Sequence, residues 1–123
     1  MTDLKYKEIT DKIIGSAYNV HNSLGQGFLE KVYKNAMTVE LEEAGLQCNV
    51  EAPLNVFYKG RKIGEYFADI IVEQKIIVEL KAIRKIEKTH EVQLVNYFKA
   101  TGLNVGLIIN FGESVEFKRK VFG

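Results

Sequence analysis

Residues 65–82 read EYFADIIVEQKIIVELKA, and this stretch organises the chain. Its two β-branched, apolar segments are separated by a short polar turn, a pattern typical of two neighbouring strands. Three charged side chains, Asp69, Glu79 and Lys81, stand inside these segments. An unpaired buried charge costs several kcal/mol, roughly, even after relaxation, so charges in apolar strands need a reason. We therefore take these three residues as the centre of a candidate site.

The register of the two strands determines whether these charges meet. Side chains two residues apart on a strand share a face, so Glu79 and Lys81 point the same way. A two-residue turn would set Asp69 opposite Leu80, on the wrong face. We therefore predict a three-residue connection or a bulge, which sets Asp69 opposite or diagonal to Glu79. Two carboxylates and one ammonium then converge, and this arrangement can hold a hard divalent cation beside a cationic group.

A surface ion-pair cluster is the alternative interpretation, because Glu-x-Lys is common on the polar face of an amphipathic strand. Three apolar residues, Phe67, Ile71 and Ile77, fall on the same face as the charges. We expect this face to be shielded from solvent, which favours the functional interpretation.

The composition indicates one globular domain spanning residues 1–123, with 46% hydrophobic and 27% charged residues. The net charge of +1 lends no support to a strongly basic nucleic-acid-binding domain, although a local basic patch is compatible with it. The single cysteine, Cys48, cannot form an internal disulfide, which fits a reducing cytoplasm. No apolar run approaches the ~18 residues of a transmembrane helix, and the start lacks a signal-peptide pattern. We expect a cytoplasmic protein without a membrane segment.

Periodicity predicts an α/β (α+β) fold, a mixed sheet flanked by helices in the order α-α-β-β-β-α-β-β. The apolar stripe of the second helix includes Leu29 and Val32, and that of the third includes Val92. Pro53 predicts that the first strand either lies at an edge of the sheet or is bent. The expected ranges are 4–24, 28–44 and 87–101 for the helices, and 47–58, 61–72, 76–83, 105–111 and 114–121 for the strands.

Four further polar residues are candidates for the site. Glu30 borders the apolar stripe of the second helix and could lean over the sheet, although the helix dipole alone favours an acid there. Gln93 and Tyr97 share one helix face, where they either belong to the site or cap the sheet edge. His21 lies among apolar residues, where a hydrogen-bonded interior role is commoner than catalysis. The chain has no phosphate-binding loop with a Walker pattern and no Cys or His pair with zinc spacing.

Several motifs together resemble a known family. Gly27, Glu30 and Tyr33 fit the pattern Gly-x-x-Glu-x-x-Tyr. The other matching features are Val20-His21, Asp69, Glu79-Leu80-Lys81, Gln93-x-x-x-Tyr97 and the strand at residues 106–111. Over nearly its whole length the chain resembles the GxxExxY proteins of the PD-(D/E)XK nuclease superfamily. The resemblance implies a restriction-endonuclease-like core of order α-β-β-β-α-β, with Ala68 standing where the superfamily name has proline.

The resemblance also implies a function. It implies a metal-dependent nuclease that hydrolyses phosphodiester bonds of nucleic acid, DNA in preference to RNA, with Mg²⁺ or Mn²⁺. The implied residues are Asp69, Glu79, Glu30 and the Leu80 carbonyl for the metal, Lys81, Glu30, Asp69, Glu79 and Gln93 for catalysis, and Gln93, Tyr97, Tyr33 and His21 for the substrate. The alternative is a weakly active or inactive nuclease-like module that binds nucleic acid or a partner protein, and a homodimer is compatible with either.

Two positions follow from these assignments. Glu30 should point toward the Asp69–Glu79 pair, because it stands at the rim of the apolar stripe of its helix. Tyr33, one turn further along, should lie against the same cleft.

Overall fold

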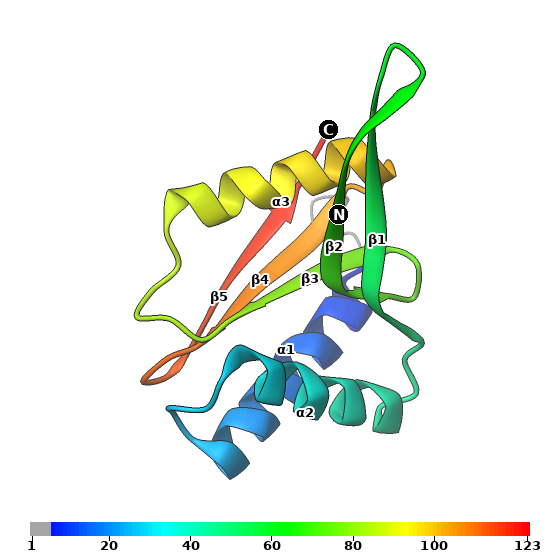
Figure 1. The fold of residues 1–123 in the computed structure, drawn as a ribbon. Helices are drawn as coiled ribbons and strands as arrows, with labels where there is room; N and C mark the ends of the chain where they lie inside the picture. Colours follow the sequence, from blue (N-terminus) through cyan, green and yellow to red (C-terminus); the bar gives the residue numbers. More distant parts are fainter. Residues whose placement is uncertain (1–5) are drawn as a thin grey trace.

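The computed structural model describes residues 6–123, which form three helices and five strands (Figure 1). Their order is the one predicted from periodicity. The elements are α1 (Lys7–Leu24), α2 (Glu30–Glu43), β1 (Cys48–Tyr58), β2 (Arg61–Val72), β3 (Ile76–Lys81), α3 (Lys88–Thr101), β4 (Val105–Phe111) and β5 (Val115–Val121). The predicted start of the first helix at Leu4 lies outside the described residues.

The strands form one mixed sheet of order β1-β2-β3-β4-β5. The pair β3–β4 is parallel, and the other three pairs are antiparallel. Parallel neighbours need a crossover connection, and α3 supplies it. The strand that contains Pro53 lies at one edge, as predicted, and all seven residues of β4 are buried in the middle of the sheet. This arrangement is a restriction-endonuclease-like α/β fold.

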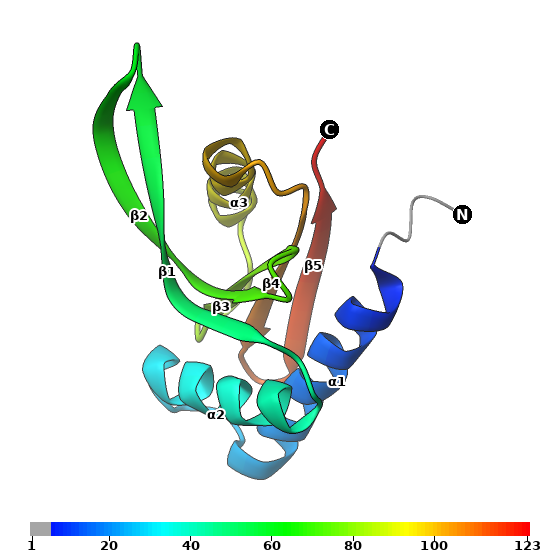
Figure 2. The same cartoon turned by 90° about the vertical axis from the view of Figure 1, so that its right-hand side faces the viewer.

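The helices cover both faces of the sheet (Figure 2). Helices α1 and α2 close one face through a core that includes Ile13, Tyr33 and Met37. Helix α3 closes the other face through Leu94 and Phe98. This helix lies very close to β4, because a Cβ added at Gly106 would be only 3.0 Å from the Leu94 and Phe98 side chains. No helix within residues 6–123 is both long and apolar enough to cross a membrane.

The connection between β2 and β3 has the predicted length. Val72 pairs with Ile76 and Ile70 with Val78, so three residues connect the strands. Two of them, Glu73 and Gln74, have left-handed φ values of 55° and 56°. Continuing this register by one step would bring Asp69 opposite Glu79, which confirms the predicted alignment of the two positions.

Strand β2 leaves β3 at this point. Of its 12 residues, only the stretch from Ile70 to Val72 pairs with β3, while its pairing with β1 runs from Cys48 to Tyr58. Figures 1 and 2 show the β1–β2 hairpin rising away from the rest of the sheet. The separation of β2 from β3 opens the sheet beside the charged residues.

Three residues assigned to helix cores are instead exposed. Leu29 is 77% exposed, because it is the extended residue that precedes α2 and the helix begins only at Glu30. Val32 is also exposed, since the buried stripe runs through Tyr33, Met37 and Leu41 at intervals of four residues. On α3, Val92 lies outside the buried face, which consists of Leu94, Tyr97 and Phe98.

Two expectations about the strands are also corrected. Strand β3 ends at Lys81, before the predicted residue 83, because the Asn110 side chain bonds both the N–H and the carbonyl of Ile83 at 2.9 Å. Phe67 is 55% exposed, although Ile77 on the neighbouring strand is fully buried. Of these two residues, only Ile77 of β3 therefore shields the charged residues from solvent, and Phe67 of β2 does not.

Candidate active site

The two central acids meet where β2 separates from β3, and each bonds the other strand. The Asp69 N–H donates to Glu79 Oε1 at 3.0 Å, and the Leu80 N–H donates to Asp69 Oδ2 at 2.8 Å. These carboxylates occupy the place where backbone carbonyls would continue the ladder, so the backbone N–H groups stay bonded as the strands part. The two acids therefore meet across neighbouring strands, as the predicted register requires, and do not point to opposite faces of the sheet.

Burial changes the protonation of this pair. Glu79 is only 8% exposed, and burial together with the charge of Asp69 raises its pKa from 4.5 to about 8. Burial also raises the pKa of Asp69, although the Leu80 N–H and two lysines act in the opposite direction. In the absence of a cation, Glu79 therefore keeps its proton at neutral pH, because a buried carboxyl group beside a second, half-buried carboxylate does not ionise easily.

Two lysines bring positive charge to the acids. Lys81, at the end of β3, is partly exposed, and its charge lowers the pKa of both Asp69 and Glu79. Lys34, on α2, also lowers the pKa of Asp69, and it forms a 2.7 Å ion pair with Glu51 of β1. Sequence reasoning missed Lys34, although its place four residues after Glu30 puts both residues on one helix face.

Glu30 begins α2 and lies at the margin of the acid pair. Glu30 is exposed, yet partial burial of its carboxylate and the charge of Asp69 raise its pKa. The charge of Lys81 acts on it in the opposite direction. The charges of Asp69 and Lys81 thus act on Glu30, and its place in the site stays a prediction.

The donors around Asp69 and Glu79 suit a hard divalent cation. Carboxylate and carbonyl oxygens are the ligands that Mg²⁺ prefers. Each acid uses one oxygen for a backbone N–H, and within residues 6–123 no hydrogen bond occupies the second oxygen. In the same part of the chain, no three His, Cys, Asp or Glu side chains form a ready-made metal cage. Two carboxylates fit Mg²⁺, because this ion usually keeps several waters and binds one or two carboxylates.

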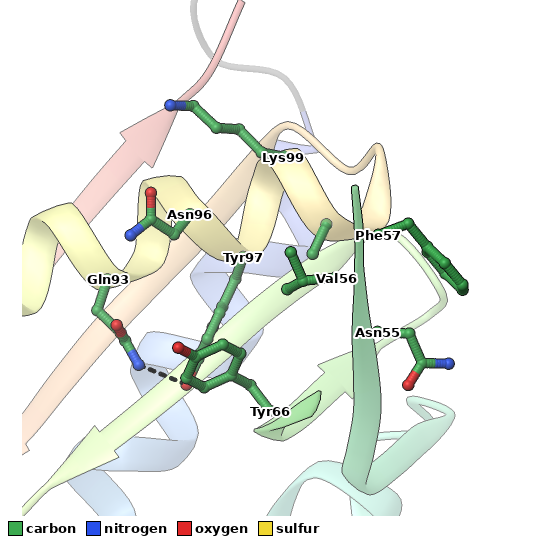
Figure 3. A pocket seen from close by; sticks show the side chains of 9 residues that line it. Asn55, Val56, Phe57, Tyr66, Gln93, Asn96, Tyr97 and Lys99 are labelled. Carbon is green, nitrogen blue, oxygen red and sulfur yellow. Dashed lines mark hydrogen bonds between the residues drawn. The ribbon is translucent and has the colours of Figure 1, made fainter. Parts of the chain in front are cut away.

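Gln93 and Tyr97 lie beside the acids on α3. The Gln93 Nε2 atom donates to the Tyr97 hydroxyl at 2.9 Å (Figure 3). Tyr97 is 6% exposed, and burial together with the charge of Glu79 raises its pKa. Tyr97 therefore packs against the sheet, in a core cluster with Ala68 and Ile77, and the role of the pair in the site stays a prediction.

Tyr33 is buried and holds a loop in place. This corrects the prediction that it binds the substrate. Its side chain is 0% exposed and stacks on Phe111 with ring centroids 4.5 Å apart. Its hydroxyl donates to the Gly25 carbonyl at 2.5 Å and accepts the Phe28 N–H at 3.3 Å. Tyr33 thus holds the loop before Glu30, since a side chain with no exposed surface cannot contact a substrate.

His21 also holds a loop. Its Nε2 atom lies 2.8 Å from the Gly112 carbonyl, and its ring stacks on Phe111 at 6.5 Å. It is partly exposed, so a contact with substrate stays a prediction. The loops that Tyr33 and His21 hold border a cleft of about 710 Å³, which Glu30 and Arg84 also line.

The metal-free protein is expected to lose stability as the pH rises from about 5 to about 8. In this range folded Glu79 keeps a proton that the unfolded chain has released. The free energy of unfolding therefore falls with pH, by up to about 1.4 kcal/mol per unit for one proton. In Glu79→Gln the side chain is neutral at every pH, so the free energy of unfolding should fall less steeply. Near pH ~8 this variant should melt at a higher temperature than the wild type. Thermal unfolding in the presence of a chelator measures both effects.

Glu91→Gln is the matched control for this measurement. Glu91 forms a 2.6 Å ion pair with Lys120, which lowers its pKa. Its contribution to stability is therefore lost only below its ordinary pKa, and the control should leave the slope between about pH 5 and about pH 8 unchanged. Equal slopes in the wild type and in Glu79→Gln would contradict a buried, protonated Glu79.

Both the sequence and the fold are similar to those of known proteins. A family model described as the PD-(D/E)XK nuclease superfamily matches residues 7–120. None of the curated proteins matches the chain. The crystal structure of SSO0001 has a similar fold, with a TM-score of 0.61 and 19% identity, over 96% of this chain and 58% of that one. This chain thus spans little more than half of that protein's length, and such a likeness concerns the fold alone. The match along almost the whole sequence shows that the chain belongs to the PD-(D/E)XK nuclease superfamily.

Proposed function

We propose that this protein is a nuclease that hydrolyses phosphodiester bonds of nucleic acid, with DNA as the expected substrate, in the presence of Mg²⁺ or Mn²⁺. The observation that supports this best is the meeting of Asp69, Glu79 and Lys81 where β2 leaves β3. Two carboxylates that can hold a metal ion and one lysine beside them are the groups that such a reaction needs. Nucleases of this superfamily generally use divalent metal ions, and the donors described above suit one.

Each residue of the site has a separate part in this proposal. Asp69, Glu79 and the Leu80 carbonyl would hold the cation, with Glu30 at the margin. A divalent cation bound there supplies positive charge to the phosphodiester and lowers the pKa of a bound water. Lys81 orients the attacking water by hydrogen bonding and stabilises the negative charge that develops on the phosphate oxygens. Gln93 and Tyr97 position the nucleic-acid strand that is cleaved.

The cleft beside Glu30 offers a path for the phosphate backbone. Arg84 lines this cleft of about 710 Å³, and Lys85 follows it in the same exposed loop after β3. Arg84 and Lys85 thus bring positive charge to a cleft that Glu30 and Glu113 also line, although the whole chain has a net charge of only +1. Phosphate contacts of this kind position nucleic acid without reading its sequence.

We also assign the chain to the GxxExxY proteins. The three residues of the motif act together: Gly27 adopts a left-handed φ of 107°, Glu30 begins α2, and Tyr33 bonds the Gly25 carbonyl. In this proposal the motif fixes the start of α2 and thereby directs Glu30 toward the acid pair. A loop that was not fastened by Tyr33 would leave this carboxylate free to turn into solvent.

The purified protein is expected to cleave nucleic acid only when Mg²⁺ or Mn²⁺ is present. Labelled single-stranded DNA, duplex DNA and RNA, each incubated with metal or with a chelator, test this on denaturing gels. Glu79→Ala should lose both metal binding and cleavage, because it removes a carboxylate and leaves the Asp69 N–H without its acceptor. Cleavage that continues in the chelator, or at the same rate in Glu79→Ala, would overturn the proposal.

A binding module without catalysis is the second candidate. It is favoured by the protonated state of metal-free Glu79 and by the lack of a three-residue metal cage within residues 6–123. Calorimetric titration with Mn²⁺ separates the two candidates. A nuclease should take up the ion and release the Glu79 proton, so the measured heat should change with the ionisation enthalpy of the buffer. A module of this kind would show no heat of binding.

A further inference from the structure

A pocket of about 450 Å³ lies between α3 and the β1–β2 hairpin (Figure 3). Two tyrosines, Tyr66 from β2 and Tyr97 from α3, meet in it with ring centroids 5.9 Å apart. Helix α3 adds two amides, Gln93 and Asn96, and Lys99 at the edge. None of the described residues that line it is a carboxylate. The pocket thus combines aromatic surface, amide groups and one positive charge.

The aromatic part of the pocket can stack on a planar ligand. Tyr66 is 48% exposed, although its ring lies against Tyr97 at a tilt of 49°. Tyr97 is 6% exposed and forms the inner wall. One tyrosine therefore holds the other in place, and the outer surface of Tyr66 stays open. Stacking on such a ring accepts any nucleobase, because every base has a π-face.

The amides can bond the edge of a base. Gln93 uses one N–H for the Tyr97 hydroxyl, so its carbonyl oxygen and its second N–H are available. Asn96 is exposed, and its amide makes no hydrogen bond with any of residues 6–123. A side-chain amide offers both donor and acceptor, as the edges of nucleobases do.

The pocket is connected to the acid pair through Tyr97. Tyr97 packs in the core cluster that includes Ala68, the residue before Asp69, and Ile77, two residues before Glu79. The charges of Glu79 and Asp69 both raise the pKa of its phenol. A base held against Tyr66 would leave the adjoining phosphate near the acids. A paired base stacked inside a duplex could not enter, because both of its faces and its pairing edge are already covered.

We propose that this pocket binds one unpaired base of the nucleic-acid substrate, so that the protein acts on single strands or on unpaired ends. This inference rests on the proposed nuclease function and names the substrate of the same site. Tyr66 supplies the stacking surface, and Gln93 and Asn96 bond the base edge.

Binding without metal tests the pocket separately from cleavage. Fluorescence anisotropy in a chelator compares a labelled single strand, the same strand with one abasic position, and the corresponding duplex. Tyr66→Ala should weaken single-strand binding about tenfold, because stacking on an aromatic ring contributes at about this level. Tyr66→Phe, which keeps the ring, should bind within about twofold of the wild type. The loss should be the same at low and high salt, since stacking releases no counterions.

Tyr18→Ala is the matched control. Tyr18 lies on α1, across the sheet from the pocket, and its 44% exposure is close to that of Tyr66. It should bind single strands as the wild type does. Asn96→Ala is a second pocket variant at an exposed position, and it should weaken binding without lowering the melting temperature. Equal single-strand affinity in the wild type and Tyr66→Ala, or a wild-type preference for the duplex, would overturn the inference. If Tyr66→Ala weakens single-strand binding but the wild type shows no metal-dependent cleavage, the nuclease proposal is wrong and the base-binding pocket still holds.

Discussion

Lys81→Ala is expected to cleave nucleic acid about 100-fold or more slowly than the wild type while it still binds the metal. Lys81 lies at the end of β3, where its charge acts on Asp69, Glu79 and Glu30. It is not among the oxygen donors that would hold the cation, so its removal takes away a charge needed mainly in the transition state. A fall in kcat at unchanged Mn²⁺ affinity is the expected pattern.

Lys12→Ala serves as the matched control, since Lys12 is an exposed lysine on α1 and is not among the charges that act on Asp69 or Glu79. It should cleave at the wild-type rate. If Lys81→Ala and the wild type show the same trace cleavage, that cleavage comes from a contaminant. The acids and Lys81 would then be the remains of a nuclease site in a protein that only binds its partner.

Mg²⁺ or Mn²⁺ should stabilise the wild type by about 2.7 kcal/mol at a concentration ~100-fold above its dissociation constant. The folded chain brings Asp69 and Glu79 together, and the unfolded chain does not, so binding favours the folded state. Asp69→Asn should remove most of this gain. The variant should still fold without metal, because the asparagine oxygen can accept the Leu80 N–H that Asp69 accepts now.

Asp11→Asn is the matched control for the metal effect. Asp11 forms an exposed ion pair with Lys7 on α1, so its loss should leave the metal response intact. The melting temperature of each variant, measured across a metal titration, gives the comparison. An equal response in the wild type and in Asp69→Asn would mean that the cation binds elsewhere on the protein.

The centre of the candidate site could be predicted because it depends on local geometry. Alternation along β3 fixes the common face of Glu79 and Lys81, and the length of the connection fixes the position of Asp69. The structure confirms the three-residue connection and the element order. The catalytic roles of these residues stay predictions until the variants are measured.

The surroundings of the acids could not be predicted, because they depend on contacts between distant segments. Glu51 leaves the β1–β2 ladder between Val50 and Ala52 with a left-handed φ of 51°, and pairs with Lys34 of α2. Neither the backbone reversal nor the helix partner has a local sequence signal. For Tyr33 the sequence does give a signal, but it suggests the wrong role. Its place in the motif suggested contact with the substrate, whereas the packing of α2 buries it completely.

The close approach of α3 to β4 has a consequence for the spacing of the site. Gly106 has no side chain, so Leu94 and Phe98 rest almost directly on the backbone of the sheet. The same helix carries Gln93 and Tyr97, whereas Glu79 lies on β3, the strand next to β4. Position 106 therefore acts as a spacer that sets how far the pocket residues stand from the acids. Alanine there would force the Leu94 and Phe98 side chains to move by a few tenths of an ångström, and a larger residue would press α3, with Tyr97, away from the sheet without altering a single residue of the site.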